Sequence, residues 1–175
     1  MESSASTGEL HKHRVCPRWL GYLLLGPIRR LLHDPSSILR PYLREGMTAL
    51  EPGPGMGFFT LELARRVGRT GRVIAVDVQP KMIERLKRRA ANASLAERID
   101  ARVTPVDSMQ LNGLDSRVDF VLAFAVVHEM PDTAAFFAEA AASMKPGARV
   151  LLVEPLGQMS DAEFDSELGM ARRAA

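Results

Sequence analysis

The sequence predicts an α/β fold, a doubly wound parallel sheet, from three observations. Short apolar runs alternate with helical patterns from residue 47 onward, and this alternation favours parallel strands joined by right-handed crossovers. The runs at 118–124 and 149–154 are apolar almost throughout, as in strands that are covered on both faces. A glycine-rich turn follows the first run, where a strand passes into a helix. The 175 residues suffice for one such domain with a proper core.

The elements expected along the chain follow from these patterns. Residues 1–9 are small and polar and are expected to be disordered. Residues 17–44 read as two short helices that break near Asp34 and Pro35, where the acid suits a helix cap. Five strands are expected, over residues 47–51, 72–77, 99–104, 118–124 and 149–154. Four further helices are expected, over residues 58–67, 80–93, 132–144 and 161–173.

A glycine motif lies at the first strand-to-helix turn. Gly53, Gly55 and Gly57 stand at alternate positions, and Asp77 ends the next strand twenty residues after the last of them. Glycine allows a ligand to approach the backbone where a Cβ would collide with it. An acid at the end of the second strand can accept hydrogen bonds from both hydroxyls of a ribose. A dinucleotide motif would have its third glycine where Phe58 stands, so the site is predicted to hold one nucleoside without a pyrophosphate.

These residues begin a longer series of motifs. Glu51-x-Gly53-x-Gly55-x-Gly57 with Asp77 resembles the first two cofactor motifs of class I S-adenosylmethionine-dependent methyltransferases. The resemblance continues through three later segments, Val103–Ser108, Val118–Ala125 and Met144–Val153, and covers roughly residues 40–160. It implies a Rossmann-like fold and S-adenosyl-L-methionine as the cofactor. The family's sheet ends in an antiparallel hairpin that is not visible in this sequence.

The resemblance assigns roles to residues at the ends of the first two strands. The three glycines would pass under the cofactor, and Glu51 would contact its methionine amino group, often through water. Asp77 would accept from the ribose, and Val78 and Gln79 would flank the adenine. The alternatives are a tight structural turn for the glycines, a solvated turn acid for Glu51 and a helix cap for Asp77.

Two later segments complete the expected cofactor site. Asp107 resembles the acid that accepts from the adenine amino group, and Ser108 would offer its backbone N–H. The alternative for Asp107 is an ordinary loop acid. Phe124 and Ala125, at the end of the fourth strand, would supply backbone near the methionine end of the cofactor.

His128 is the candidate catalytic residue. It follows the fourth strand, on the side of the sheet where ligands bind, and could take a proton from an O–H or N–H acceptor. The alternative is a histidine that caps a helix or loop. Methyl transfer to an already nucleophilic centre depends on positioning more than on a base. The histidines and acids lack metal-ligand spacing, so no metal is expected.

The chain is expected to divide near residue 45. Residues 1–45 would form a disordered tip and a helical lid, and residues 46–175 the cofactor-binding domain. Trp19 and Tyr22 could line an apolar acceptor pocket or pack their helix onto the domain. Cys16 is the only cysteine, which excludes an intramolecular disulfide framework and disfavours arsenic as the acceptor.

Composition and local sequence argue against several classes of binding partner and methyl acceptor. The formal charge of +2 is small, so no nucleic-acid partner is expected. The apolar run Trp19–Ile28 is too short to span a membrane, which needs about twenty residues, and a cytoplasmic location is expected. Ala125–His128 differs from the (N/D)PP(Y/F) motif of enzymes that methylate amino groups of DNA bases or glutamine, so acceptors of that kind are disfavoured.

The function expected is therefore a methyltransferase that transfers a methyl group from S-adenosylmethionine to a small-molecule acceptor. One alternative is a truncated or degenerate domain that binds S-adenosylmethionine or S-adenosylhomocysteine without turnover. A nucleotide-dependent oxidoreductase is a second alternative, disfavoured by Phe58. With five strands visible, the fifth is expected to be an edge, so either the sequence is a fragment or a partner chain covers it. Self-association through this edge is the expectation for a chain of natural length.

Overall fold

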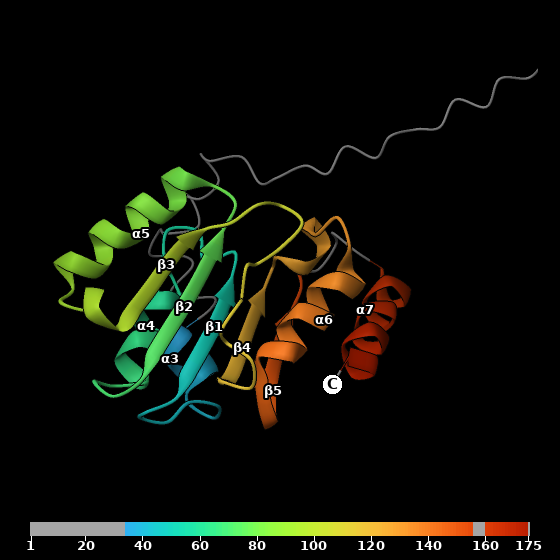
Figure 1. Ribbon diagram of the computed structural model, residues 1–175, viewed down its shortest axis with the longest axis horizontal. Helices are drawn as coiled ribbons and strands as arrows, with labels where there is room; N and C mark the ends of the chain where they lie inside the picture. The colour runs from blue at the N-terminus through green and yellow to red at the C-terminus, as the bar shows by residue number, and fades with distance from the viewer. Residues whose placement is uncertain (1–33, 156–159, 175) are drawn as a thin grey trace, which may run out of the picture.

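Five parallel strands form one sheet in the order β3-β2-β1-β4-β5 (Figure 1). The computed structural model describes residues 34–155 and 160–174. The strands are β1 (Thr48–Pro52), β2 (Arg72–Asp77), β3 (Ile99–Val103), β4 (Val118–Phe124) and β5 (Met144–Val153). The helices are α3 (Pro35–Leu39), α4 (Thr60–Arg66), α5 (Pro80–Asn92), α6 (Thr133–Ser143) and α7 (Asp161–Ala174), with short 3₁₀ turns η1 (Ala96–Arg98) and η2 (Val127–Glu129). The α/β doubly wound fold predicted from the sequence is confirmed.

The strand order reverses at β1. From β1 the sheet grows through β2 to β3, and the chain then returns to place β4 on the other side of β1. Ala49 is consequently paired with Val73 of β2 and with Phe120 of β4. The loops after β1 and β4 therefore lead to helices on opposite faces. Open α/β sheets bind ligands in the crevice at such a switch point.

The core lies in two layers, one on each face of the sheet. Successive residues of a strand point to opposite faces, so Val73 belongs to one hydrophobic cluster and Ile74 to the other. The first cluster joins the sheet to α3 and α4, and the second joins it to α6 and α7. On the face of the first cluster, Leu86 of α5 packs with Ala75 and Ala101 from β2 and β3.

The observed bounds agree with the expected ones within two residues, apart from the end of α3, which lies at Leu39 instead of near residue 44, and the start of β5. This strand begins at Met144, whereas the sequence suggested a helix end and a turn before residue 149. Met144 pairs with Val118, and the ladder shifts register before Arg149 pairs with Phe120. Pro146, which lacks an N–H, is tolerated here because one side of β5 has no partner strand among the described residues.

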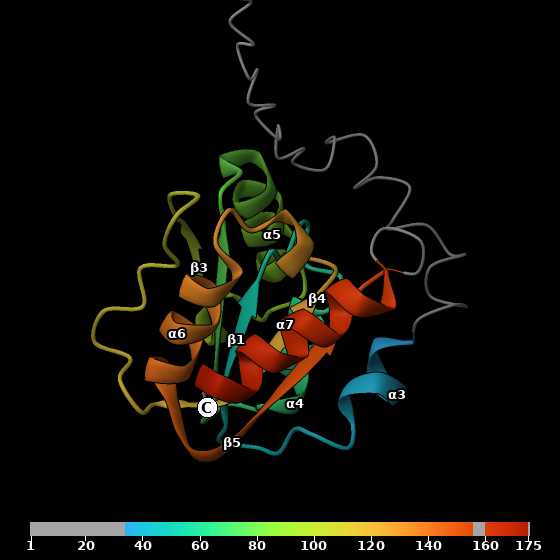
Figure 2. The same ribbon diagram turned by 90° about the vertical axis from the view of Figure 1, so that its right-hand side faces the viewer.

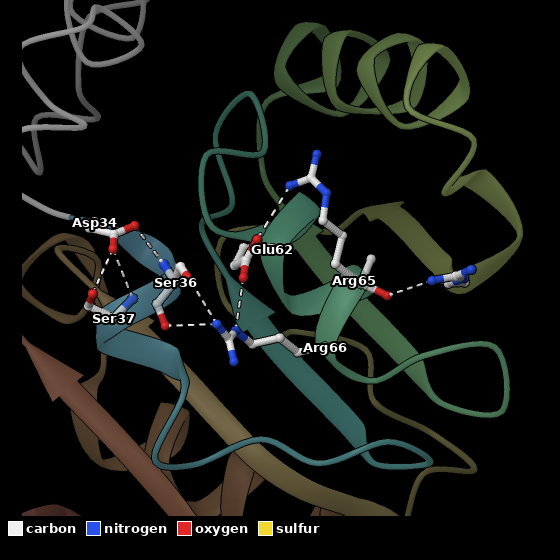
Figure 3. A network of polar contacts seen from close by, with 8 residues as sticks. Asp34, Ser36, Ser37, Glu62, Arg65 and Arg66 are labelled. Atoms are coloured by element: carbon white, nitrogen blue, oxygen red, sulfur yellow. Dashed lines mark hydrogen bonds and ion pairs between the residues drawn. The ribbon is translucent and has the colours of Figure 1, made fainter.

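Side-chain hydrogen bonds join α3 to α4 (Figure 3). Asp34 accepts the N–H groups of Ser36 and Ser37 at 3.0 and 3.2 Å, so the predicted helix cap is confirmed. Arg66 of α4 donates to the carbonyl and hydroxyl oxygens of Ser36 at 3.0 and 2.7 Å. The same guanidinium donates from Nε to Glu62 at 2.9 Å. The second of the two helices expected over 17–44 is therefore present, though short.

The first of those helices lies outside the described residues, with Cys16, Trp19 and Tyr22. At the other end of the domain, α7 lies on the β5 side of the molecule in both views (Figures 1 and 2). Met170 and Ala171 of α7 pack against the second core cluster. Self-association through the β5 edge remains a prediction. Among the described helices, none combines the length and the apolar character needed to cross a bilayer.

Candidate cofactor and acceptor site

The three glycines after β1 have different surroundings. A Cβ on Gly53 would lie 2.6 Å from Val126 Cγ2, and a Cβ on Gly57 would collide with Leu86. These two glycines are therefore needed for packing within the protein. Gly55 has φ +54°, and a Cβ there would meet no atom of the described residues within 4 Å, apart from its neighbours in the chain. Gly55 is the member of the motif that faces open space, as a backbone that cradles a ligand should.

Asp77 lies beside this turn, at the end of β2. Its Oδ2 accepts the N–H of Gly55 at 3.3 Å, and its Oδ1 accepts the N–H of Gln79 at 2.8 Å. An ionised carboxylate has about four acceptor positions, so each oxygen keeps one for another donor. Burial raises the pKa of Asp77, against the lowering effect of the two backbone N–H groups. The carboxylate is thus held at the turn with acceptor capacity for two hydroxyls.

Glu51 is the second buried acid of this region. It is 4% exposed and lies on β1, opposite Ala75 of β2. A carboxylate that is removed from water is costly unless donors or a cation lie near it. The contact expected from the resemblance, with an amino group of the cofactor, would provide such a cation.

The loop after β3 is held by α6. Glu139 accepts the hydroxyl of Ser108 at 3.2 Å and the N–H groups of Met109 and Leu111 at 2.8 and 3.1 Å. Asp107 directly precedes this anchored segment and is exposed. The structure therefore brings Asp107 and Ser108 to the carboxyl end of the sheet on an ordered loop. Val78 and Gln79 follow β2 at the same end and are half-buried.

The segment after β4 packs on the glycine turn. Phe124 places its ring against Phe59, with centroids 4.4 Å apart, so only its backbone is available near the crevice. Ala125 has φ +53°, an uncommon conformation for a residue with a Cβ, and donates its N–H to Val153 of β5 at 2.7 Å. Val126 then makes the contact with Gly53. This backbone geometry sends the chain into η2, which carries His128.

His128 is paired with the carboxylate of Glu154, the residue that follows β5. Its Nδ1 lies 2.5 Å from Oε2 of Glu154, whose Oε1 accepts the N–H of Val127 at 2.8 Å. The Glu154 side chain is 2% exposed and the His128 side chain 18%. Glu129 Oε1 is 4.0 Å from the other ring nitrogen, Nε2, which is beyond hydrogen-bond distance. The helix- or loop-capping role considered for His128 finds no support in these contacts.

A further acid lies behind this pair. Glu167 of α7 is 6% exposed, and burial, followed by the charge of Glu154, raises the pKa of its carboxyl group. The charge of His128 acts in the opposite direction. Three acids therefore face His128 within the described chain: Glu129 on its own turn, Glu154 after β5 and Glu167 on α7.

The arrangement fits S-adenosylmethionine. Gly55 leaves space beside its backbone, Asp77 keeps acceptors for a ribose, and Glu51 offers a buried carboxyl group. All three lie at the switch point between β1 and β4 or beside it. A pyrophosphate would need a third close approach of backbone, and Phe58 stands at that position.

Comparisons with known proteins agree with this fit. Residues 49–147, more than half of the chain, match the family described as the methyltransferase domain, and the chain belongs to this family. An arsenite methyltransferase of Halobacterium salinarum is 31% identical over 107 residues, 61% of this chain and 27% of that protein. A demethylmenaquinone methyltransferase of Staphylococcus aureus is 30% identical over 112 residues, 64% of this chain and 44% of that protein. The chain thus spans less than half the length of these curated relatives.

A solved structure covers more of the chain. The crystal structure of a SAM-dependent methyltransferase from Aquifex aeolicus has a TM-score of 0.76 and 26% identity, over 92% of this chain and 89% of that chain. These findings confirm the resemblance to class I S-adenosylmethionine-dependent methyltransferases and, at the level of the family, the cofactor. They give no support to the oxidoreductase alternative.

Sequence reasoning missed three contributors to the site. Glu154, Glu139 and Val126 hold His128, the loop after β3 and the glycine turn, respectively. A signal existed for Glu154, because it directly follows an apolar run expected to be a parallel strand, at the strand end where ligand-facing side chains gather. The expectation that this strand is covered on both faces was wrong, since no residue of β5 is fully buried within the described part of the chain. Glu139 and Val126 carry no such signal, since their partners are distant in sequence.

Proposed function

We propose that this protein transfers a methyl group from S-adenosylmethionine to a small-molecule acceptor. The observation that carries the proposal is the turn after β1, where Gly55 faces open space and is hydrogen-bonded to the buried Asp77. S-adenosylmethionine, when bound, supplies a methyl group on a positively charged sulfur. The task of the protein is then to hold the acceptor at attack distance in the correct orientation.

Each residue of the site is assigned to one part of the cofactor. Asp77 accepts from the ribose, and the backbone at Gly55 allows the cofactor to lie close to the turn. Glu51 faces the methionine amino group, and Asp107 with the Ser108 N–H faces the adenine, flanked by Val78 and Gln79. The backbone of Phe124 and Ala125 borders the methionine end, with Gly53 and Gly57 shaping the turn.

A small-molecule acceptor is supported by the relatives named above, which act on arsenite and on demethylmenaquinone according to their descriptions. Among these chemistries an organic acceptor suits this chain better, because Cys16 is its one cysteine. We place the cofactor domain at residues 46–175, with residues 1–45 as the segment that borders the acceptor. A cytoplasmic location fits a cofactor made inside the cell.

Two measurements test the proposal in order. Calorimetry with S-adenosylmethionine, S-adenosylhomocysteine and NAD should show binding of the first two and none of the third. A transfer assay with methyl-labelled S-adenosylmethionine and a small-molecule mixture should then yield labelled products. Binding without transfer to any acceptor would favour a binding domain without turnover, and tight binding of NAD would overturn the assignment.

A further inference from the structure

We propose that Glu154 is a positioning residue that holds His128 in the tautomer whose Nε2 accepts a proton, and that this pair deprotonates a hydroxyl group of the methyl acceptor. The inference rests on the proposed function and deepens it, because it names the chemical class of the acceptor.

The hydrogen bonds of Glu154 set the tautomer. An ionised carboxylate can only accept, and its two oxygens are directed at Nδ1 of His128 and at the N–H of Val127. Nδ1 must therefore carry the proton of the neutral ring, and the lone pair resides on Nε2. The second hydrogen bond anchors the backbone of η2 to the same carboxylate, so ring and turn are oriented together.

The two side chains of the pair differ in their exposure to solvent. The Glu154 side chain is almost completely buried, whereas the His128 ring keeps part of its surface exposed. A buried carboxylate is maintained only when donors satisfy it, as the two hydrogen bonds do here. Burial raises the pKa of the neighbouring Glu167, and the charge of Glu154 adds to this effect. That charge is placed to stabilise the ring when it becomes positive.

The pair lies next to the cofactor turn. Val126, one residue before η2, packs on Gly53, and Ala125 lies at the end of β4 beside the crevice. His128 is thus carried by the segment that borders the methionine end of the proposed cofactor site. A base at this end of the crevice lies where the acceptor must approach.

A hydroxyl acceptor is the chemistry that needs this base. A neutral amine or a trivalent arsenic already presents a lone pair of good nucleophilicity, whereas a hydroxyl is a weak nucleophile until its proton is removed. In the proposed step the acceptor O–H bond breaks, the proton passes to the lone pair of Nε2, and the electron pair stays on oxygen. The imidazolium that results is paired with the Glu154 carboxylate.

The decisive variant is Glu154→Gln. Its amide oxygen can still accept the N–H of Val127, but its NH₂ group would donate to Nδ1 and so force the proton onto Nε2. The base would then be lost with little change in shape. Turnover with phenol, catechol or hydroquinone as acceptor should fall by about 10²–10⁴-fold, with S-adenosylmethionine affinity within about twofold of the wild type. The turnover of His128→Ala should be reduced by a similar factor. The turnover of the double variant should be no lower than that of either single variant, because the two residues act as a unit.

Nitrogen NMR provides a readout that does not depend on activity. In protein labelled with ¹⁵N-histidine, the His128 signals are those missing from His128→Ala. They should show Nδ1–H and unprotonated Nε2 in the wild type and the reverse in Glu154→Gln. The matched control is Glu97→Gln, an exposed acid in η1 before β3, at the opposite end of the sheet, which should change neither tautomer nor turnover.

The outcomes separate the two proposals. If the wild type transfers methyl groups and both variants keep full turnover, the base is refuted while the methyltransferase assignment stands. Nε2–H in the wild type would refute the tautomer assignment directly. If Glu154→Gln lowers both the melting temperature and the affinity for S-adenosylmethionine, Glu154 has a structural role only, and the positioning role is refuted. If the wild type transfers to no acceptor, the proposed function fails and the inference with it.

Discussion

Gly55→Ala is the most direct perturbation of the proposed cofactor site. Within residues 34–155 and 160–174 the added Cβ meets no atom within 4 Å beyond its chain neighbours, so no steric clash is expected there. At φ +54° the left-handed backbone costs a residue with a Cβ roughly 1–2 kcal/mol, partly offset by about 0.4–1 kcal/mol from the stiffer unfolded chain. The net loss should be about 1 kcal/mol, or a melting temperature roughly 2–4 °C lower. The methyl group would occupy the space assigned to the cofactor, and affinity should fall at least about tenfold, which corresponds to about 1.4 kcal/mol.

Gly113 offers a matched control for the backbone effect. It has φ +78°, and a Cβ there also meets nothing within 4 Å, but it lies in the loop that leads to β4. Gly113→Ala should therefore lose a similar amount of stability. It should bind S-adenosylmethionine as the wild type does. The difference between the two variants in affinity, at equal stability, isolates the contact with the cofactor.

Thermal unfolding and calorimetry of the three proteins decide the matter. Wild-type affinity in a folded Gly55→Ala protein would refute the cradle at Gly55. Equal loss of affinity in Gly113→Ala would show that the loss comes from backbone strain alone. Gly55→Val, with a branched Cβ, should abolish binding altogether.

Three further changes follow from single contacts. Asp77→Asn should weaken S-adenosylmethionine binding at least about tenfold in calorimetry, because a charge-assisted acceptor is lost. Burial raises the pKa of Asp77, so the folded protein holds the proton of this carboxyl group more tightly than the unfolded chain does. The resulting contribution to the free energy of unfolding is complete below about pH 3.9, the pKa in the unfolded chain, and is lost as the pH rises through the pKa in the folded protein. Cofactor-free Asp77→Asn should therefore melt higher than the wild type at pH 7, by a margin that narrows toward about pH 4; a constant margin would contradict this. Glu167→Gln should behave in the same way, as burial raises that pKa too, and a lower melting temperature at neutral pH would show that the Glu167 charge is needed. Asp34→Ala should lower the midpoint of denaturant unfolding, because α3 loses its cap, with cofactor affinity unchanged.

The parts of the fold that depend on local pattern were predictable. The glycine turn, Asp77 at the end of β2 and the helix opened by Pro80 are recorded in a few consecutive residues, and their bounds agree with the structure. The start of β5 was predicted wrongly, because Pro146 and Gly147 indicate a turn locally. The start of β5 is set instead by its pairing with β4, which joins residues far apart in sequence.

The support of the site was not predictable for the same reason. Glu139 reaches the loop after β3 from a helix thirty residues away, and Glu154 reaches His128 across twenty-six residues. The sequence places Glu154 at the end of a strand but does not show that His128 is its partner, and it shows Glu139 as an ordinary charged residue of a helix. Their role exists only once β4 and β5 lie side by side and α6 covers the second face of the sheet.

The topology of the sheet also explains why binding and proton transfer can be assigned to different residues. The cofactor-binding group consists of Glu51 in β1, Gly55 in the turn after β1 and Asp77 at the end of β2. The second group consists of His128, which follows β4, and Glu154, which follows β5. Val126 packs on Gly53 where the two groups approach each other. Among the described side chains, no hydrogen bond or ion pair joins Asp77 to Glu154, so a change in one carboxylate leaves the partners of the other in place. The side of β1 and β2 can therefore be optimised for a constant cofactor, while the side of β4 and β5 is altered to suit the acceptor.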